Sequence, residues 1–568
     1  MNVSEDRARS AFGNEQDERT YRKALKAKQG FVKRFGDDSN AVYHLKSADV
    51  PVIGEALGVR NLVMADGDTA LDLAADAAAA PKPALTDRTV AGADGAPVIV
   101  GNIRMGFGHY RISMAMASAA HAMGHTPYWL DLAADAAAQG MPATTERTVA
   151  GADGKPVIVG NIRMGFGHYR ISMAMASAAH AMGYTPYWLD LASFDETTGS
   201  KVIAYQNQLY SLGSRLSQQI GLFNRLYWEP LNSEGFRKLS YNAGDQKNAE
   251  LCTPLFRDIP QDTPYVGTHV WPAQAAVHAG LTHVVNAIPD NWPMALHLAE
   301  GSIHTVQTPS AYLGYHQLRG MDPKRQLKPM PLESLVYTGH YVDHELVSNI
   351  GRDCAARRAR LMGGGPVRYL ISVGGAGAQQ ELFAAIIERL LPYVKTDQAT
   401  LLINVGDHRG VWEGLEKSVS GLAELAQRHF DDFTEVASLA EGALDGELTG
   451  VHAFCDGDIF SAVYSSNLLM RCADVLVTKP SEFSFYPVPK LMIHRVGGHE
   501  AWGAIRAAEV GDGTYEIDET DEVLAMIDSF QLDRELICFM CDRIEDAWHA
   551  GIYDGAYKVI DLAVKGHV

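Results

Sequence analysis

Two identical fifteen-residue segments constrain the fold of this 568-residue chain more than any other feature. Residues 97–111 and residues 156–170 both read Pro-Val-Ile-Val-Gly-Asn-Ile-Arg-Met-Gly-Phe-Gly-His-Tyr-Arg. In the second copy a β-branched apolar run predicts a buried strand, Gly165 and Gly167 predict a tight turn, and the small residues that follow predict a helix. This order is typical of the unit that opens a nucleotide-binding α/β domain.

The repeat extends well beyond these letters. Residues 72–133 align with residues 131–192 at a constant offset of 59, and only seven of the 62 aligned pairs differ. The first strand of a doubly wound sheet is central, so two identical strands compete for one position. We expect copy two, which runs directly into the downstream sequence, to fill that position and copy one to be an appended βαβ unit. The sequence leaves open that the duplication is an artefact of sequence assembly.

Composition narrows the class of protein and its partners. A chain of this length is expected to form two or three domains. The net charge of −19 argues against nucleic acid as a partner and leaves at most peripheral contact with a membrane. A polar N-terminus, the absence of a long apolar run and six scattered cysteines predict a cytoplasmic protein. Cys538 and Cys541 are expected to pack within a helix, and no spacing indicates a metal site.

Strands and helices alternate in two sets, before and after a glycine-rich linker at residues 363–366. The second set has predicted strands at 368–373, 400–405, 472–478 and 490–495. We therefore predict an α/β protein with two Rossmann-like, doubly wound domains facing a cleft. The predicted parts are a mostly helical N-terminal extension (1–71), the extra βαβ copy (72–130), the N-terminal Rossmann-like domain (131–362), the C-terminal Rossmann-like domain (363–530) and closing helices (531–568).

Several motifs, in a fixed order over residues 156–515, resemble those of one glycosyltransferase group. They are Gly165-Phe-Gly-His168, Thr268-His269, Pro289-Asp290 with Trp292, Thr338-Gly339-His340, Gly374-Gly375, Ala473-Asp-Val-Leu-Val-Thr-Lys-Pro480, Gly498-His499-Glu500 and Gly511-Asp-Gly513. The chain resembles the branch of GT-B glycosyltransferases that contains monogalactosyldiacylglycerol synthases, processive diacylglycerol glucosyltransferases and the peptidoglycan N-acetylglucosaminyltransferase. The resemblance implies a GT-B-like fold.

One stretch departs from the family pattern. After the strand that ends at Thr478-Lys479, the family has a glycine-rich turn and a helix whose Glu holds the donor ribose. Here residues 480–489 are about five residues shorter and contain bulky aromatic residues and two prolines, Pro487 and Pro489, which leave no room for a full helix. The donor pocket is therefore either rebuilt or lost. Glu482 is a candidate for the ribose carboxylate, with a capping or surface glutamate as the alternative.

The resemblance assigns the candidate site residues to two sides. On the donor side, backbone amides at Gly374, Gly375 and Gly377 suit phosphates at a helix start, with a plain tight turn as the alternative. The other donor-side candidates are Glu482, His499 and Glu500. The acceptor-side candidates are Gly165, Gly167, His269 and Trp292, and Arg163 and Arg170 are either anion contacts or surface residues.

His168 and Asp290 are the catalytic candidates. His168 follows a glycine turn after a strand, and Asp290 stands where a strand ends, which is where α/β sheets place ligands. A carboxylate or imidazole there can take the proton of an acceptor hydroxyl.

The leading hypothesis is a glycosyltransferase-like enzyme that uses a nucleoside-diphosphate sugar, UDP-linked in the resembling families, and no separate cofactor. The sequence does not identify the donor sugar. The acceptor is unknown. A non-catalytic binding protein on the same fold is the main alternative, and a sugar-nucleotide epimerase is a third.

Overall fold

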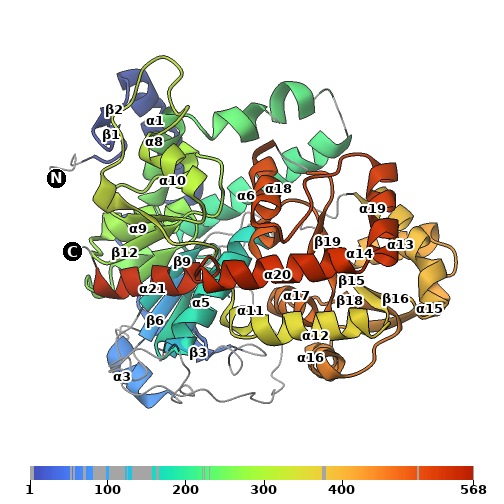
Figure 1. The fold of residues 1–568 in the computed structure, drawn as a ribbon. Helices are drawn as coiled ribbons and strands as arrows, with labels where there is room; N and C mark the ends of the chain where they lie inside the picture. Colours follow the sequence, from blue (N-terminus) through green and yellow to red (C-terminus); the bar gives the residue numbers. More distant parts are fainter. Residues whose placement is uncertain are drawn as a thin grey trace. The chain divides into compact units, whose positions relative to one another are not determined.

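The computed structural model divides the chain into two compact units (Figure 1). Unit 1 contains Met1–His344, Gly497–His499 and Asp554–Val568, and unit 2 contains Glu345–Val496 and Glu500–Tyr553. The structure describes residues 6–50, 54, 58–67, 72–80, 88, 97–101, 122–123, 126–130, 157–161, 166–219, 222, 224–228, 230–373, 379–495 and 498–566. The boundary expected at 362/363 falls within unit 2.

Unit 1 is built on a ten-stranded sheet with the order β14-β13-β12-β11-β6-β10-β4-β3, in which β8 also pairs with β6 and β9 with β10. All of these pairs are parallel except β3–β4. The strands are β3 (Leu45–Asp49), β4 (Arg60–Met64), β6 (Pro97–Gly101), β8 (Thr126–Leu130), β9 (Val157–Asn161), β10 (Thr185–Asp190), β11 (Tyr265–Gly267), β12 (Val284–Ala287), β13 (Ile303–Val306) and β14 (Leu335–Tyr337). The stretch assigned to a helical extension thus adds β3 and β4 to this sheet.

Helices and a small hairpin complete unit 1. The hairpin is β1 (Ser10–Ala11) with β2 (Asn14–Glu15). The main helices are α1 (Glu18–Phe35), α3 (Leu73–Ala79), α5 (Phe166–Ala181), α6 (Thr198–Gln219), α8 (Leu239–Ala249), α9 (Val270–Ala279), α10 (Pro309–His316) and α21 (Gly555–Lys565). Several start at a side chain that accepts a backbone N–H, such as Asp17 for α1 and Thr308 for α10.

The two copies of the duplicated strand both pair with the same neighbouring strand, β10, at the same position in the sheet. β6 belongs to copy one and β9 to copy two, and both pair with β10 in the same register: Pro97 pairs with Thr185, and Val157 pairs with Pro186. Copy one also pairs with β11. The expected arrangement, with copy two alone in the central position, therefore differs from the observed pairing. Because the two copies have nearly identical sequences, pairing of either copy with β10 is expected to have nearly the same free energy.

We expect a chain that lacks residues 72–130 and a chain that lacks residues 131–189 both to fold, because each keeps one complete copy for one position. The two shortened chains differ only where the copies differ. Among these sites Tyr184 of copy two is 4% exposed, and copy one has His125 there. The chain that keeps Tyr184 should be more stable by about 1–2 kcal/mol, because a buried aromatic ring is lost in the other. Urea denaturation measures both.

A His125→Tyr replacement in the chain that lacks residues 131–189 is the matched control, and it should restore most of the difference. Loss of cooperative unfolding in both shortened chains would contradict a single shared position. It would mean that the sheet needs both copies.

Unit 2 is built on a six-stranded, fully parallel sheet with the order β17-β18-β16-β15-β19-β20. The strands are β15 (Val367–Ser372), β16 (Ala399–Asn404), β17 (Ala426–Phe430), β18 (Gly450–Cys455), β19 (Val475–Thr478) and β20 (Lys490–Met492). The main helices are α12 (Ile350–Met362), α13 (Gln380–Val394), α14 (Arg409–Ser418), α16 (Phe433–Asp445), α17 (Ile459–Cys472), α18 (Ala501–Val510), α19 (Thr520–Leu532) and α20 (Glu535–His549). Every residue of β15, β16 and β19 is buried, as expected for parallel strands covered on both faces.

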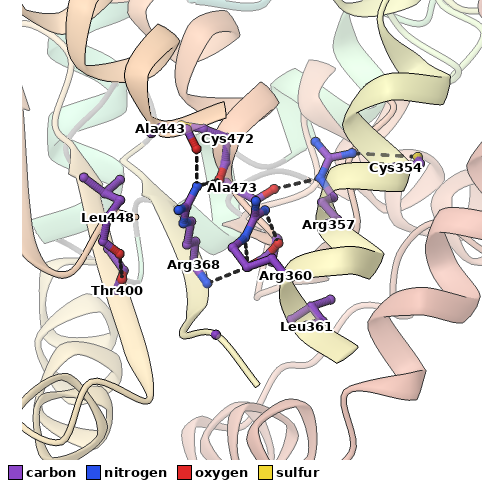
Figure 2. Close-up of polar contacts among 12 residues, drawn as sticks. Cys354, Arg357, Arg360, Leu361, Arg368, Thr400, Ala443, Leu448, Cys472 and Ala473 are labelled. Atoms are coloured by element: carbon purple, nitrogen blue, oxygen red, sulfur yellow. Dashed lines mark hydrogen bonds and ion pairs between the residues drawn. The ribbon is translucent and has the colours of Figure 1, made fainter. Parts of the chain in front are cut away.

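Three buried or half-buried arginines form polar contacts in unit 2, and two of them hold helix ends (Figure 2). Arg357 donates to the carbonyls of Met470 and Ala473, where α17 ends, and Arg368 donates to the carbonyl of Ala443 near the end of α16. Arg360 instead pairs with the carboxylate of the buried Asp474. Arg357 and Arg368 satisfy carbonyls that a helix C-terminus leaves without intrahelical partners. The network is therefore structural.

The fold class predicted from the sequence is confirmed: the chain is an α/β protein with two Rossmann-like, parallel-sheet domains. Cys538 and Cys541 lie in α20, where Cys541 is buried, as expected. The short 480–489 stretch holds only a single 3₁₀ turn, Glu482–Phe485, as its prolines predict. In the part of the chain that the structure describes, no helix has the length and apolar character needed to cross a membrane.

Candidate active site in unit 1

The candidate site lies where the strand order of unit 1 reverses. The chain passes from β9 to β10 on one side and from β11 to β12, β13 and β14 on the other. In open parallel sheets ligands bind at the carboxyl ends of the strands that flank such a point. His168, in the first turn of α5 after β9, and His269, directly after β11, meet there with ring centroids 5.5 Å apart. Gly167 precedes His168 in that turn, and Gly165 and Arg163 lie outside the described residues.

Hydrogen bonds fix the tautomers of both histidines. The Nδ1 atom of His168 is 2.7 Å from the carbonyl oxygen of Thr268, so Nδ1 must carry the proton and Nε2 is left as an acceptor. His269 caps α9 by accepting the Trp271 N–H at Nδ1, so its Nε2 carries the proton. Ser172 bonds both the His168 carbonyl and the Thr268 hydroxyl, which ties α5 to the end of β11.

Burial keeps both imidazoles neutral. Desolvation lowers the pKa of His168 to about 3, against an upward pull from the negative charge of Asp290 and from the Thr268 carbonyl. Desolvation also lowers the pKa of His269 well below its usual range, and His168 and His297 act in the same direction. Near neutral pH, the site therefore presents an unprotonated Nε2 atom on His168.

Asp290 supplies the negative charge of the site. It follows β12, and its Oδ2 atom accepts a hydrogen bond from Nε2 of His297 at 3.0 Å. The His297 side chain is 2% exposed, whereas that of Asp290 is 32% exposed. His297 thus holds the carboxylate from the buried side and leaves part of it accessible. This geometry suits a base that takes a proton from a bound hydroxyl.

Trp292 is held beside Asp290 by contacts from two other elements. The guanidinium of Arg237 lies 4.6 Å from the Trp292 ring centroid. Tyr315 in α10 donates its hydroxyl to the Trp292 carbonyl at 3.2 Å. Gly314 allows the approach of α10, because a Cβ there would lie 2.2 Å from Cγ of Pro293. The Trp292 segment is therefore a fixed wall of the site.

The sequence reasoning missed two members of this cluster. His297 lies in a 3₁₀ turn, Ala295–His297, and only its position between two apolar residues marks it as buried. Asp245 in α8 is 3% exposed and accepts from Nε1 of Trp271 at 2.8 Å, and desolvation raises its pKa well above the usual range. α8 buries a polar face, so it shows no apolar stripe by which these contacts could be predicted.

Lowering the pH from 7.5 to 5.5 should destabilise the protein, and His168→Gln should reduce this effect by about 1 kcal/mol. The folded state keeps His168 neutral down to a pKa of about 3, while the unfolded chain takes up a proton below about 6.5. The stabilising contribution is therefore complete above pH 6.5 and is lost as the pH falls towards 3. Urea titrations at both pH values give the difference.

His549→Gln, which removes an exposed histidine by the same substitution, is the matched control. An identical pH dependence in His168→Gln and in the unmodified protein would show that His168 is not held neutral.

The donor-side candidates belong to unit 2 except His499, which belongs to unit 1, and they are only partly described. Glu500 pairs with Lys479, which follows β19, and Glu482 is half-buried in the 3₁₀ turn. Gly374, Gly375 and Gly377 fall outside the described residues, and of His499 the structure describes only the backbone, in the turn Gly498–Glu500. The strand order of unit 2 reverses between β15 and β19, so the loops after these strands flank its own switch point.

The position of one acceptor-side arginine is also described. Arg170 is buried in α5 of unit 1 and does not lie on the surface.

Among the described residues, one group has the composition of a cation site. Side-chain atoms of His494, Glu516 and Asp518 lie within 4.8 Å of one another. His494 bonds Asp518 at 2.8 Å, and Glu516 pairs with Arg495. Because His494 and Asp518 are exposed and all three groups are already paired, we assign it no function.

Comparisons with known proteins give a family but no activity. A model described as domain of unknown function DUF6937 matches residues 10–143 and again residues 139–317, and one described as domain of unknown function DUF6938 matches residues 330–564. The first DUF6937 match contains copy one of the duplicated strand and helix, and the second contains copy two. No curated protein matches the chain.

Solved structures are similar to the chain at a low level. A UDP-GlcNAc 2-epimerase from Neisseria meningitidis is 13% identical, with 62% of this chain and 88% of that chain covered and a TM-score of 0.35. A trehalose-phosphate synthase from Burkholderia xenovorans is also 13% identical, with 60% and 83% covered and a TM-score of 0.30. The N-terminal domain of a Candida albicans trehalose-6-phosphate phosphatase is 9% identical, with 61% and 82% covered and a TM-score of 0.33. These likenesses are too weak to assign a function.

The two matches to the DUF6937 model together span residues 10–317, which is more than half of the 568-residue chain. The chain therefore belongs to the family described as domain of unknown function DUF6937.

Proposed function

We propose that the protein is a glycosyltransferase-like enzyme that transfers a sugar from a nucleoside-diphosphate sugar to an acceptor hydroxyl. The observation that carries the proposal is the arrangement of His168, His269, Asp290 and His297 at the switch point of the unit 1 sheet. A neutral imidazole acceptor beside a partly exposed carboxylate is suited to deprotonating a hydroxyl. The ordered motifs shared with GT-B glycosyltransferases add support for this reaction class.

The proposed roles follow from the geometry. Asp290 takes the acceptor proton, and His297 positions its carboxylate from the buried side. His168 accepts a hydrogen bond from the acceptor at Nε2, and Trp292 forms a wall beside it. The nucleotide phosphates are assigned to the loop of Gly374 and Gly375, and UDP is the nucleotide used in the resembling families. No resident cofactor enters this scheme.

One observation favours a non-catalytic binding protein as the second candidate. In the short 480–489 stretch, Phe483, Phe485 and Tyr486 are 3%, 5% and 1% exposed. Their rings pack into unit 2 where the resembling families have a glycine-rich turn and a helix. A donor pocket altered in this way can bind a nucleotide without holding its sugar for transfer.

The test has two stages. Thermal-shift titration of the full chain with UDP, GDP, UDP-glucose, UDP-galactose and UDP-GlcNAc first identifies a ligand, with Gly375→Asp as the variant that blocks the phosphate loop. Mass spectrometry then follows the bound sugar nucleotide over time in the presence of simple sugar and diacylglycerol acceptors.

The outcomes separate the candidates. Release of UDP together with a glycosylated acceptor supports the transferase. Binding that Gly375→Asp abolishes, with no turnover, supports the binding protein, and conversion to an isomeric UDP-sugar supports an epimerase. No thermal shift with any nucleotide at millimolar concentration would rule out the proposed function.

A further inference from the structure

A pocket lies in unit 1 within the loop that follows α10. Its volume is about 370 Å³, which is within the usual size range of small-molecule sites. Every residue that lines it comes from one stretch: His316, Gln317, Leu318, Arg319, Gly320, Asp322, Arg325, Gln326, Leu327 and Pro329. None of these residues belongs to the site around Asp290.

The loop is closed and fastened at several points, so the pocket has a fixed frame. Two hydrogen bonds join His316 and Met330 at the base of the loop. The Met330 N–H donates to the His316 carbonyl, and Nδ1 of His316 donates to the Met330 carbonyl. On the far side, Asn14 bonds both the N–H and the carbonyl of Lys328, and Arg325 donates to the carbonyl of Glu15. The loop therefore runs beside the β1–β2 hairpin, as Figure 1 shows.

Positive charge gathers at this pocket on a chain whose net charge is −19. The Arg319 side chain makes no hydrogen bond or ion pair with any residue that the structure describes, and it lines the pocket. The Arg237 guanidinium packs directly behind Gly320, whose φ is +72° and where a Cβ would lie 2.1 Å from Nη2 of Arg237. Arg237 also donates to the Arg319 carbonyl. A side chain at position 320 would displace this second cation.

One acidic residue lines the pocket, and its charge is already offset. Asp322 accepts from Nε of Arg325 at 2.8 Å and from the Lys324 N–H at 2.9 Å. The amides of Gln317 and Gln326 are additional lining groups that can donate hydrogen bonds. Arg237 does not line the pocket and is paired with Glu234, so the net positive charge of the lining comes from Arg319.

We infer that this loop pocket binds a small molecule through an oxyanion, either a phosphate or a carboxylate. A guanidinium offers paired donors that match both groups, and Arg319 has such donors available. Arg237 links the pocket to the other site, because the same guanidinium lies over the Trp292 ring. The inference is independent of the proposed transferase reaction.

Isothermal titration of the full chain with inorganic phosphate and, separately, with malonate tests the inference at constant ionic strength. We expect one of the two probes to bind at millimolar concentration or tighter, and Arg319→Gln to weaken that binding at least tenfold. Lys324→Gln is the matched control, because it removes an exposed cation of the same loop that does not line the pocket. It should change the affinity less than twofold.

Gly375→Asp separates this pocket from the proposed nucleotide-phosphate loop and should leave the binding unchanged. A preference for phosphate or for malonate identifies the group that the natural ligand carries. The inference is overturned if neither probe binds, if Arg319→Gln binds as the unmodified protein does, or if Gly375→Asp removes the binding. Thermal melting without ligand verifies that Arg319→Gln is folded.

Discussion

Asp290→Asn is expected to lower kcat for the proposed sugar transfer by about 10²–10⁴-fold, with a much smaller change in KM. Asparagine keeps the size of the side chain and can still accept from Nε2 of His297, so the local structure should persist. It cannot take up a proton at neutral pH, so the loss falls on the step in which the acceptor hydroxyl is deprotonated. Steady-state kinetics with the donor found by thermal shift gives both constants.

Asp262→Asn is the matched control, because it makes the same chemical change at an exposed site of unit 1. His297→Gln provides a second readout for the positioning role of that residue. It should move the acid limb of the kcat profile, since the partner that orients the Asp290 carboxylate is changed. An unchanged kcat in Asp290→Asn would remove Asp290 from the chemistry and would leave His168 as the base.

The sequence was informative where an apolar run ended in a chemically distinctive residue. His168 and Asp290 were predicted from such positions and His269 and Trp292 from the family resemblance, and the structure places all four at one edge of the unit 1 sheet. The edge itself follows from topology, because parallel strands bring their carboxyl ends together. What each residue does there remains a prediction.

Other parts of the fold and of the site have no local sequence pattern from which they could be predicted. The strands β17 and β18 were not predicted, because β17 has two exposed residues and few apolar ones and β18 contains a polar His452. His297 and Asp245 act through partners distant in sequence or on other elements, and neither has a motif of its own. The pairing of both copies with β10 was also missed, since sequence identity alone does not decide between two equal strands.

Lys490→Met should destabilise the protein by about 3–5 kcal/mol, because it leaves an uncompensated buried carboxyl group. Lys490 and Asp512 are both fully buried, and their Nζ and Oδ2 atoms are 2.7 Å apart. Nζ also donates to the carbonyls of Tyr486 and Val488, and Tyr553 donates to Asp512 at 2.8 Å. Burial lowers the pKa of Lys490 and raises that of Asp512, against the effect of each on the other. Chemical denaturation measures the change.

Through these carbonyls the same lysine also holds the aromatic stretch at residues 480–489, so its loss should weaken the nucleotide binding proposed for unit 2. Lys395→Met, at an exposed site, is the matched control and should alter stability by less than about 0.5 kcal/mol. The double variant Lys490→Met/Asp512→Leu should recover most of the loss, because an apolar pair replaces both buried charges. A single variant destabilised by less than about 1 kcal/mol would show that the ion pair contributes little, and that packing of Phe483, Phe485 and Tyr486 alone holds the segment.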